Sequence, residues 1–535
     1  MKRYVPLILI LFIVPPLVFL ALWARSGLWP DAPDVPDASN TLAPTATGGA
    51  QTGIPTPEQE TQAEATVTPS TESDSEPTIA PPDPIPAQAS TDHPTVHVDL
   101  DNIIGAGPRY YGVEYSWTDQ DEALFIERYR ILGANTVRVQ LTQDLFEPVN
   151  DNDDPNHSEI DFSITAEYDA AQNKTLTYER MLKALIEAFP DMHFHINMWL
   201  AARWNAAEPE GYMGLGGAFP PRDYAEHREF VRETARWLVD ACGIPPEQIS
   251  FSFVNEPNLP AFFVGTGDDL MRMAAESRAA LDEISPSIQM GGLDEVHGTS
   301  WTEEFAQAQS PHCCDMWTFH AYEHGLTEME NTLQQRIGRL RPYGPVWVTE
   351  FADTRFGSPD ARMDLSGRDA AIGLASMLGR IWPAGIDGVA HFRLSDTYVD
   401  RLGGWVGHGL FADRHGTRSG GVAFEPYPSF WVFSNLYNEF GGGSILHTSA
   451  PAELSVFAVR HESGDPSRAA IWLTNPTANN LAIMLSISAL PDEARITVLD
   501  NLAGRDPFHT ETVSGPSLAF ETILPPHSSY SIIIH

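Results

Sequence analysis

Cysteine and lysine are nearly absent from this chain, and acidic residues greatly outnumber basic ones. The 535 residues include only three cysteines, Cys242, Cys313 and Cys314. So small and odd a number argues against a disulfide framework as the basis of the fold. Asp and Glu total 72 against 32 Lys and Arg, which gives a formal net charge of −40 at pH 7. This charge repels phosphate backbones, so it argues against nucleic acid as a partner and suits a neutral ligand such as a sugar.

Motifs for metal or cofactor binding are also scarce. The cluster at 312–315 contains adjacent Cys313 and Cys314, but neighbours on an extended strand point to opposite faces and no second Cys-x-x-Cys pair is present. A buried thiol in a strand is therefore the preferred interpretation, and we expect no metal. There is no Gly-x-Ser-x-Gly elbow, phosphate-binding Gly-Lys-Ser/Thr loop or Gly-x-Gly-x-x-Gly. We expect no organic cofactor.

The amino-terminal part divides into an apolar segment and a long polar stretch. Residues 4–23 are uncharged and mostly apolar, with basic residues on both sides. This length matches one bilayer crossing, and the flanking charges favour an extracellular position for the bulk of the chain. We interpret residues 1–25 as a single-pass membrane anchor; a cleavable signal peptide, which would make the protein secreted, is the alternative. Residues 26–94, rich in Pro, Thr and Ser, are predicted to form a disordered linker.

Between residues 95 and 440, short apolar runs alternate with amphipathic helical patterns. Gly133 and Gly385 lie where helices should stop. Eight strands that alternate with helices predict a (β/α)8 TIM barrel, an α/β fold, and a doubly wound open sheet is the alternative. The predicted strands are Tyr111–Trp117, Asn135–Leu141, Met192–Trp199, Ile249–Asn255, Ser287–Gly292, Asp315–His320, Pro345–Glu350 and Gly388–Leu394.

The periodicity changes again after the three glycines at 441–443. Runs with alternating side chains, separated by turn residues such as Gly515-Pro516, predict a C-terminal antiparallel β-sandwich over residues 441–535. The strand Val96–Leu100, which precedes the barrel, is a candidate member of this accessory domain. The predicted sandwich strands are Leu454–Arg460, Arg468–Thr474, Leu481–Ile487, Arg495–Leu499 and Tyr530–Ile534.

Two of the predicted barrel strands end in a glutamate. One run stops at Asn255-Glu256-Pro257, where the proline ends the strand, and the run that starts at Pro345 ends at Glu350. These are strands four and seven, whose carboxyl ends open on the same face, so we expect both carboxylates in one bowl. Two carboxylates that flank a sugar can share the acid and nucleophile roles of glycoside hydrolysis. Retention and inversion both stay open, because they differ in the separation of the carboxylates.

Four more polar residues fall at or near predicted strand ends: Asn255, Arg138, His320 and Tyr322. We expect Arg138 to hold the ionised glutamate by a charge-assisted hydrogen bond and Tyr322 to donate to the nucleophile. His320 and Asn255 are candidates for contact with substrate. For each residue taken alone, a buried polar group satisfied by its own neighbours is the alternative.

Four tryptophans lie where a sugar platform is expected, namely Trp117, Trp199, Trp204 and Trp405. Flat apolar sugar faces stack on indole rings, so these are candidate substrate-binding residues. Core packing is the alternative, and it is the preferred interpretation for Trp317 and Trp347, which lie inside predicted strands rather than at their ends.

The strand-end motifs resemble those of the retaining glycoside hydrolases of clan GH-A. The string Asn-Glu-Pro-Asn-Leu-Pro at 255–260, with His320-Ala-Tyr322 and Thr349-Glu350, is most similar to glycoside hydrolase family 39. The cellulase-like enzymes of family 5 are the second choice. The resemblance implies Glu256 as acid/base and Glu350 as nucleophile. It also implies that Asn255 contacts the substrate 2-hydroxyl and that Arg138, His320 and Tyr322 support the site.

The chain departs from this pattern at two places near the expected substrate, so the sugar specificity stays open. Phe351-Ala352 stand where family 39 commonly has Trp-Asn, and His391-Phe392-Arg393 stand where many clan members carry a tryptophan. We predict a membrane-tethered retaining β-glycosidase that acts on β-linked oligo- or polysaccharides through a covalent glycosyl-enzyme intermediate. A non-catalytic surface carbohydrate-binding protein on the same barrel is the alternative.

Overall fold

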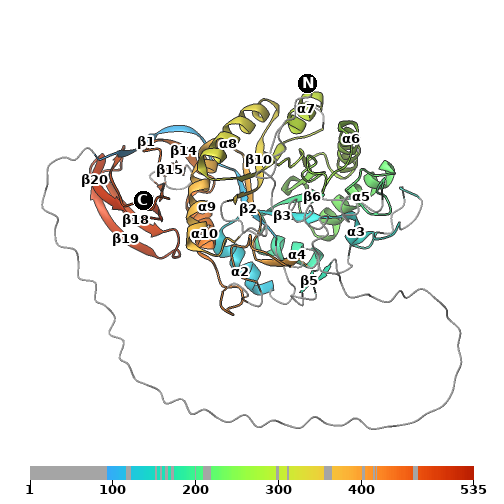
Figure 1. The fold of residues 1–535 in the computed structure, drawn as a ribbon, viewed down its shortest axis with the longest axis horizontal. Helices are drawn as coiled ribbons and strands as arrows, with labels where there is room; N and C mark the ends of the chain where they lie inside the picture. Colours follow the sequence, from blue (N-terminus) through green and yellow to red (C-terminus); the bar gives the residue numbers. More distant parts are fainter. Residues whose placement is uncertain are drawn as a thin grey trace, which may run out of the picture. The chain divides into compact units, whose positions relative to one another are not determined.

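The structure, a computed structural model, describes residues 93–535 with short internal gaps (Figure 1). The predicted membrane anchor and linker therefore lie outside the described residues. Within the described part, no helix has both the length and the apolar character needed to cross a membrane. The gaps are residues 116–121, 151–153, 157–159, 163–166, 170–173, 177, 199–200, 209–217, 297–299, 310–312, 355–363, 400–403, 414–415, 417–418 and 462–467.

Eight parallel strands form the inner sheet of the larger part, in the order β8-β7-β6-β3-β2-β11-β10-β9. Parallel bridges from Gly291 to Met316 and from Glu295 to Phe319 join the two ends of this sheet. The strands therefore close into a (β/α)8 barrel, as predicted, rather than the alternative open sheet. The strands are β2 (Tyr110–Glu114), β3 (Thr136–Leu141), β6 (His193–Met198), β7 (Ile249–Ser252), β8 (Gln289–Gly291), β9 (Trp317–Glu323), β10 (Val346–Asp353) and β11 (Gly388–His391).

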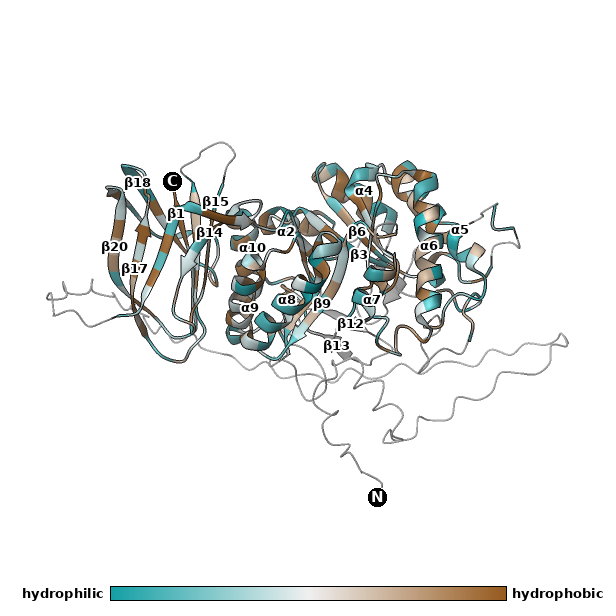
Figure 2. Ribbon diagram, turned by 90° about the horizontal axis from the view of Figure 1, so that it is seen from above, coloured by the Kyte–Doolittle hydropathy of each residue, from teal (hydrophilic) through white to brown (hydrophobic). Residues whose placement is uncertain are grey.

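Amphipathic helices surround these strands, and the exposed ones show separate teal and brown faces in Figure 2. Gly133 ends the first of them with a φ of 74°, and Gly385 has a φ of 81°, so both glycines act as the predicted stop signals. The helices are α2 (Glu122–Leu132), α3 (Gln143–Phe146), α4 (Tyr178–Ala188), α5 (Tyr224–Arg236), α6 (Gly267–Ile284), α7 (Ser300–Gln309), α8 (Leu326–Leu340), α9 (Arg368–Ile381) and α10 (Pro428–Phe440).

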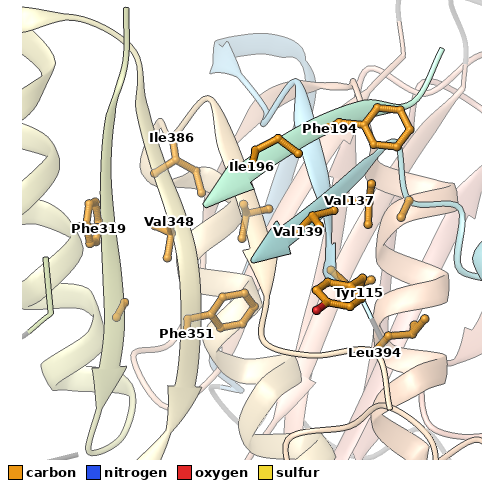
Figure 3. Close-up of a cluster of buried hydrophobic side chains, with 14 of the residues drawn as sticks. Tyr115, Val137, Val139, Phe194, Ile196, Phe319, Val348, Phe351, Ile386 and Leu394 are labelled. Atoms are coloured by element: carbon orange, nitrogen blue, oxygen red, sulfur yellow. The ribbon is translucent and has the colours of Figure 1, made fainter. Parts of the chain in front are cut away.

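Polar and apolar side chains alternate along the barrel strands. Apolar residues such as Val137, Ile196 and Val348 belong to the large core cluster between strands and helices (Figure 3). The intervening residues are polar and equally buried. His193 and His195 both contact the hydroxyl of Ser250, at 2.8 and 2.9 Å. Burial lowers the pKa of His193 to about 3 and that of His195 to about 4, so both are neutral packing groups inside the barrel.

The two ends of the described chain together build a nine-stranded sheet, in the order β19-β18-β21-β16-β15-β14-β1-β17-β20. The strand β1 (Thr95–Ala106) is antiparallel to β14 and parallel to β17. The candidate strand Val96–Leu100 therefore joins the C-terminal strands, but its parallel partner departs from the purely antiparallel sandwich that we expected. The remaining strands are β14 (Ser444–Ser449), β15 (Ser455–Arg460), β16 (Ala469–Asn475), β17 (Leu481–Ser488), β18 (Glu493–Asp500), β19 (Pro507–Ser514), β20 (Ser517–Leu524) and β21 (Ser528–Ile534).

This sheet packs against the barrel through helix α9. The indole nitrogen of Trp472 donates to the backbone oxygen of Ala375 at 3.0 Å, and the hydroxyl of Ser455 donates to the oxygen of Ser376 at 2.8 Å. A side chain on Gly379 would place its Cβ 2.1 Å from the Ser455 Oγ, so this contact requires glycine. Two small sheets lie in the barrel loops, β4 (Glu167–Asp169) with β5 (Lys174–Leu176) and β12 (Thr397–Val399) with β13 (Gly404–Val406).

Candidate active site

Two glutamates meet at the carboxyl end of the barrel strands. Glu256 follows β7, the fourth barrel strand, and Glu350 lies in β10, the seventh. Each is 6% exposed. One carboxylate oxygen of each lies within 4.8 Å of the other and of a ring nitrogen of His320. The structure thus brings together the two carboxylates that the motifs singled out, as barrel geometry requires.

Strand register explains why other polar side chains join them. Glu114 on β2 is the Cα partner of Arg138 on β3, and Arg138 is the partner of His195. In the same way Glu350 is the partner of His320 on β9. Residues paired across neighbouring strands point to the same side of the sheet. These five side chains therefore share the inside of the barrel.

Arg138 is the cation at the centre of this group. Its Nη1 donates to Oε1 of Glu350 at 2.6 Å and to Oε2 of Glu114 at 2.5 Å. Its Nη2 donates to Oδ1 of Asn255 at 3.1 Å and to Oδ2 of Asp294 at 3.4 Å. Burial lowers the pKa of Arg138, but the surrounding carboxylates outweigh this effect and raise the pKa above its ordinary value. The guanidinium is therefore charged at every working pH.

The two glutamates have different partners. The hydroxyl of Tyr322 donates to Oε2 of Glu350 at 2.6 Å, so both oxygens of Glu350 are hydrogen-bonded. Oε1 of Glu256 lies 2.6 Å from Nδ1 of His320, which is also 3.6 Å from Oε2 of Glu350. Arg138 and Tyr322 thus make the contacts expected from the sequence. His320 contacts Glu256, which fits the supporting role that the resemblance implies, and its contact with substrate stays a prediction.

Burial raises the pKa of both glutamates, and their neighbours oppose the shift to different extents. Burial is the largest influence on Glu256, and the hydrogen bond and charge of His320 act against it. Burial also raises the pKa of Glu350, while Arg138 and Tyr322 both lower it. Burial raises the pKa of Tyr322 well above its usual value, so its hydroxyl stays a donor. Two donors, one of them a cation, therefore favour the ionised form of Glu350.

Two residues of the site have an unusual backbone. Glu256 has a φ of 44° and Asp294 a φ of 48°, in the left-handed region that side chains other than glycine rarely adopt. Such conformations cost about 1–3 kcal/mol each and are concentrated at functional sites. Both residues follow the ends of strands, where the chain turns away from the barrel.

Asp294 and Glu114 are site residues that our sequence analysis missed. Asp294 accepts hydrogen bonds from the amide of Asn197 and the hydroxyl of Thr349, both at 2.7 Å. Burial raises the pKa of Asp294, but Arg138 and the other partners lower it below its ordinary value overall. Asp294 closely follows the predicted strand Ser287–Gly292, so the rule that selected Glu350 could also have selected it, whereas Glu114 lies inside the predicted strand Tyr111–Trp117.

Two rings from the segment after strand β11 lie near Tyr322. The ring of Phe392 lies 5.2 Å from that of His408, which in turn lies 6.4 Å from the ring of Tyr322. The rings of Phe392 and His408 therefore border Tyr322, which donates to Oε2 of Glu350.

The four candidate tryptophans have different outcomes. Trp117 and Trp199 lie outside the described residues. Trp405 lies in β13 opposite Tyr398, but its side chain is outside the described part. Trp204 is half-buried, and its indole nitrogen donates to the backbone oxygen of Glu147 at 2.9 Å. Stacking of a sugar on these rings stays a prediction.

The trio Glu256, His320 and Glu350 is also, among the described residues, the one group of His, Cys, Asp and Glu spaced to hold a metal ion. Arg138 and Tyr322 already occupy the oxygens of Glu350, and the guanidinium repels a second cation. The arrangement therefore favours proton transfer over metal binding.

The cysteine pair is not arranged as expected. The sulfur atoms of Cys313 and Cys314 lie 3.0 Å apart rather than on opposite faces. The two residues precede β9 and so are not constrained by the alternation of an extended strand.

A comparison with known families agrees with this site. Residues 269–368 match the family model described as "Glycosyl hydrolase catalytic core". This segment includes His320, Tyr322 and Glu350. The chain carries the catalytic core of a glycoside hydrolase.

This glycoside hydrolase is similar in fold to solved glycosidases. A glucosidase from Croceicoccus marinus is 15% identical with a TM-score of 0.60, over 83% of this chain and 98% of that chain. A family 39 enzyme from Xanthomonas axonopodis pv. citri is 14% identical with a TM-score of 0.58, over 83% and 98%. A monomeric β-xylosidase from Caulobacter crescentus CB15 is 15% identical with a TM-score of 0.58, over 83% and 99%. These likenesses establish the fold and agree with the motif resemblance to family 39. No curated protein matches the chain in sequence.

Proposed function

We propose that this glycoside hydrolase is a retaining β-glycosidase that forms a covalent glycosyl-enzyme intermediate. The observation that carries the proposal is the approach of the Glu256 and Glu350 carboxylate oxygens to within 4.8 Å of each other. Retaining enzymes keep their carboxyl groups about 5–5.5 Å apart, whereas inverting enzymes need about 6.5–9.5 Å to admit a water. This close approach of the oxygens supports retention over inversion.

Glu350 suits the role of nucleophile. Arg138 and Tyr322 each donate to one of its oxygens at 2.6 Å, which orients the carboxylate and favours its ionised form. In the first step, a carboxylate oxygen of Glu350 attacks the anomeric carbon of the sugar. The bond from that carbon to the leaving oxygen breaks as a glycosyl ester forms.

Glu256 suits the role of acid and base. Burial raises its pKa, so it can carry the proton that the leaving oxygen needs. Once that proton is transferred, the ionised Glu256 can accept a hydrogen bond from His320 Nδ1, 2.6 Å away. In the second step Glu256 takes a proton from water, and the water oxygen displaces Glu350 from the anomeric carbon. The sugar leaves with its original configuration, and both glutamates return to their starting states.

The substrate class that we propose is a β-linked glucoside or xyloside. The support is the fold shared with a glucosidase from Croceicoccus marinus and a β-xylosidase from Caulobacter crescentus CB15. The ring pair Phe392 and His408 borders the site and would influence the choice of sugar.

The test uses a panel of aryl β-glycosides, with β-glucoside and β-xyloside first. Wild type should turn over at least one of them, whereas Glu350→Gln and Glu256→Gln should lose about 10²–10⁴-fold in rate. Glu493→Gln on β18, an exposed carboxylate of the C-terminal sheet, is the matched control and should behave as wild type. The proposal would be wrong if folded wild type were inactive on every glycoside or if Glu350→Gln kept full activity.

We further propose that residues 4–23 tether the catalytic part to the outer side of a cell membrane, on the basis of their length and flanking charges. Amino-terminal sequencing of the mature protein from washed membranes tests this. An intact amino terminus in the membrane fraction supports the anchor, and a start near residue 25 in a soluble fraction supports a secreted form.

A further inference from the structure

Glu114 is a buried carboxylate of the active site that the mechanism above does not use. It ends strand β2 and is 1% exposed. Its Oε2 lies 2.5 Å from Nη1 of Arg138, the same nitrogen that donates to Oε1 of Glu350 at 2.6 Å. Among the described residues, Arg138 is the only side chain that donates to Glu114. Glu114 and Glu350 therefore share Nη1 of one guanidinium, and Glu350 has a second donor in Tyr322.

Asp294 also contacts Arg138 but does not compete in this way. It contacts Nη2 rather than Nη1, at 3.4 Å, and it has closer donors in Asn197 and Thr349, both at 2.7 Å. Its negative charge is thus satisfied without the nitrogen that Glu114 and Glu350 share.

The groups that face Glu114 come from several elements. Arg138 lies on β3, Glu350 on β10 and Arg393 beyond β11. The negative charge of Glu114 also raises the pKa of three buried hydroxyls, those of Tyr115, Tyr129 and Tyr322. Burial is the largest influence and, with the repulsion from Glu350, raises the pKa of Glu114 to about 7; Arg138 and Arg393 oppose this. Glu114 is therefore a group whose charge can change in the working range of pH.

We propose that Glu114 is a positioning residue that competes with Glu350 for Nη1 of Arg138 and thereby controls the ionisation and orientation of the nucleophile. This inference rests on the proposed function, which assigns the nucleophile role to Glu350. When Glu350 becomes a neutral ester, Nη1 keeps Glu114 as its acceptor. The guanidinium then stays in place for the second step, in which Glu350 must leave as a carboxylate.

The experiment isolates the nucleophile from the acid/base residue. The probes are 2,4-dinitrophenyl 2-deoxy-2-fluoro-β-D-glucoside and the corresponding xyloside. Their leaving group departs without a proton, so the rate at which they label the enzyme does not require Glu256. The pH dependence of labelling therefore reports on Glu350 and its neighbours.

The variant is Glu114→Gln, which keeps the size of the side chain and an oxygen that can accept from Nη1, but carries neither charge nor proton. The matched control is Glu295→Gln. Glu295 is also 1% exposed, but its carboxylate accepts from the backbone and hydroxyl of Thr302. Both variants remove one buried carboxylate, and only one of them touches Arg138.

We expect wild-type labelling to change with a midpoint near pH 7, where Glu114 gains the charge that competes with Glu350 for Arg138, and we expect Glu114→Gln to lack this midpoint. Glu295→Gln should keep the wild-type midpoint. A midpoint that is the same in wild type and Glu114→Gln would overturn the inference, even if the variant were slower or less stable.

Infrared titration of the carboxylic acid band gives a readout that needs no substrate. Wild type should lose a buried acid band near pH 7 that Glu114→Gln lacks, and the remaining carboxylate bands should shift over the same pH range in wild type only. Unchanged remaining bands would contradict the competition. Failure of both probes to label wild type would count against the proposed function, while the infrared result would still decide the coupling between the two carboxyl groups.

Discussion

The hydroxyl of Tyr322 donates a hydrogen bond to Oε2 of Glu350 over 2.6 Å. Because Arg138 holds the other oxygen, the loss of Tyr322 alone would leave Glu350 in place but less well oriented. A hydrogen bond to a charged group contributes about 1.5–3 kcal/mol, so Tyr322→Phe should lower kcat/KM roughly 10- to 100-fold.

The control for this change is Tyr224→Phe. Tyr224 donates in the same way to Oδ1 of Asp269 at 3.0 Å, but it joins helices α5 and α6. Steady-state kinetics of the two variants should differ, with Tyr224→Phe at the wild-type value. Wild-type kcat/KM in Tyr322→Phe would remove this hydrogen bond from the account of catalysis.

Removal of the Arg138 guanidinium should destabilise the fold. In Arg138→Met three carboxylates, Glu114, Glu350 and Asp294, lose their shared cation inside the barrel. Breaking a buried charge arrangement of this kind costs about 3–5 kcal/mol in the free energy of unfolding. Urea denaturation at pH 7 measures this.

Arg228→Met is the matched variant on the surface. Arg228 also has two acidic partners, Glu276 and Glu283, but its side chain is 37% exposed. Exposed ion pairs contribute about 0–1 kcal/mol, so the free energy of unfolding should fall several-fold less in Arg228→Met than in Arg138→Met. Equal losses in the two variants would show that Arg138 is not the main counter-charge of the site.

Stability should depend on pH through Glu114. Its folded pKa is about 7, above the ordinary value of 4.5. The folded state thus binds the proton more tightly, and the stability from Glu114 is fully present below pH 4.5 and is lost as pH rises to 7. Wild type should therefore lose about 3 kcal/mol of unfolding free energy between pH 4.5 and 7, relative to Glu114→Gln, which has no proton to lose. Urea unfolding at several pH values checks this, and a constant difference would contradict the raised pKa.

The contact between barrel and C-terminal sheet gives a prediction about packing. In Gly379→Ala the new Cβ would lie 2.1 Å from Oγ of Ser455, which is buried and bonded to the Ser376 oxygen. Overpacking of this kind costs about 1–3 kcal/mol. Gly338→Ala, on the exposed face of α8 with nothing near the added carbon, should be neutral or stabilising. Thermal unfolding of both variants distinguishes them. An unchanged melting temperature in Gly379→Ala would contradict the prediction and mean that Ser455 can move to make room for the methyl group.

Local sequence patterns were sufficient for the barrel and for the residues at its strand ends. Glu256, Glu350, Arg138 and Tyr322 could be found because an apolar run shows where a strand ends, and barrel closure then brings those ends together. Asp294 follows a predicted strand but lacks a motif that marks it, and Glu114 was not found because the predicted strand runs past it to Trp117 whereas β2 ends at Glu114.

The pairing of strands that lie far apart in the chain was harder to predict from the sequence. Strands β1 and β17 pair in parallel although they lie almost four hundred residues apart, and no local pattern carries that register. Ten of the thirteen residues of helix α10 are buried, and this hides the one-sided periodicity by which a surface helix is recognised in a sequence. The contact between His320 and Glu256 was not predicted, because it depends on side-chain geometry between separate strands.

The most direct test of the account is to map the residue that a fluorinated glycoside labels. The full-length protein is incubated with the 2,4-dinitrophenyl 2-deoxy-2-fluoro-β-D-glucoside or xyloside, and its peptides are analysed by mass spectrometry. The account predicts one sugar per chain, attached to Glu350 and absent from Glu350→Gln. A label on Glu256, or turnover of the parent glycosides with inversion and without any label, would contradict it.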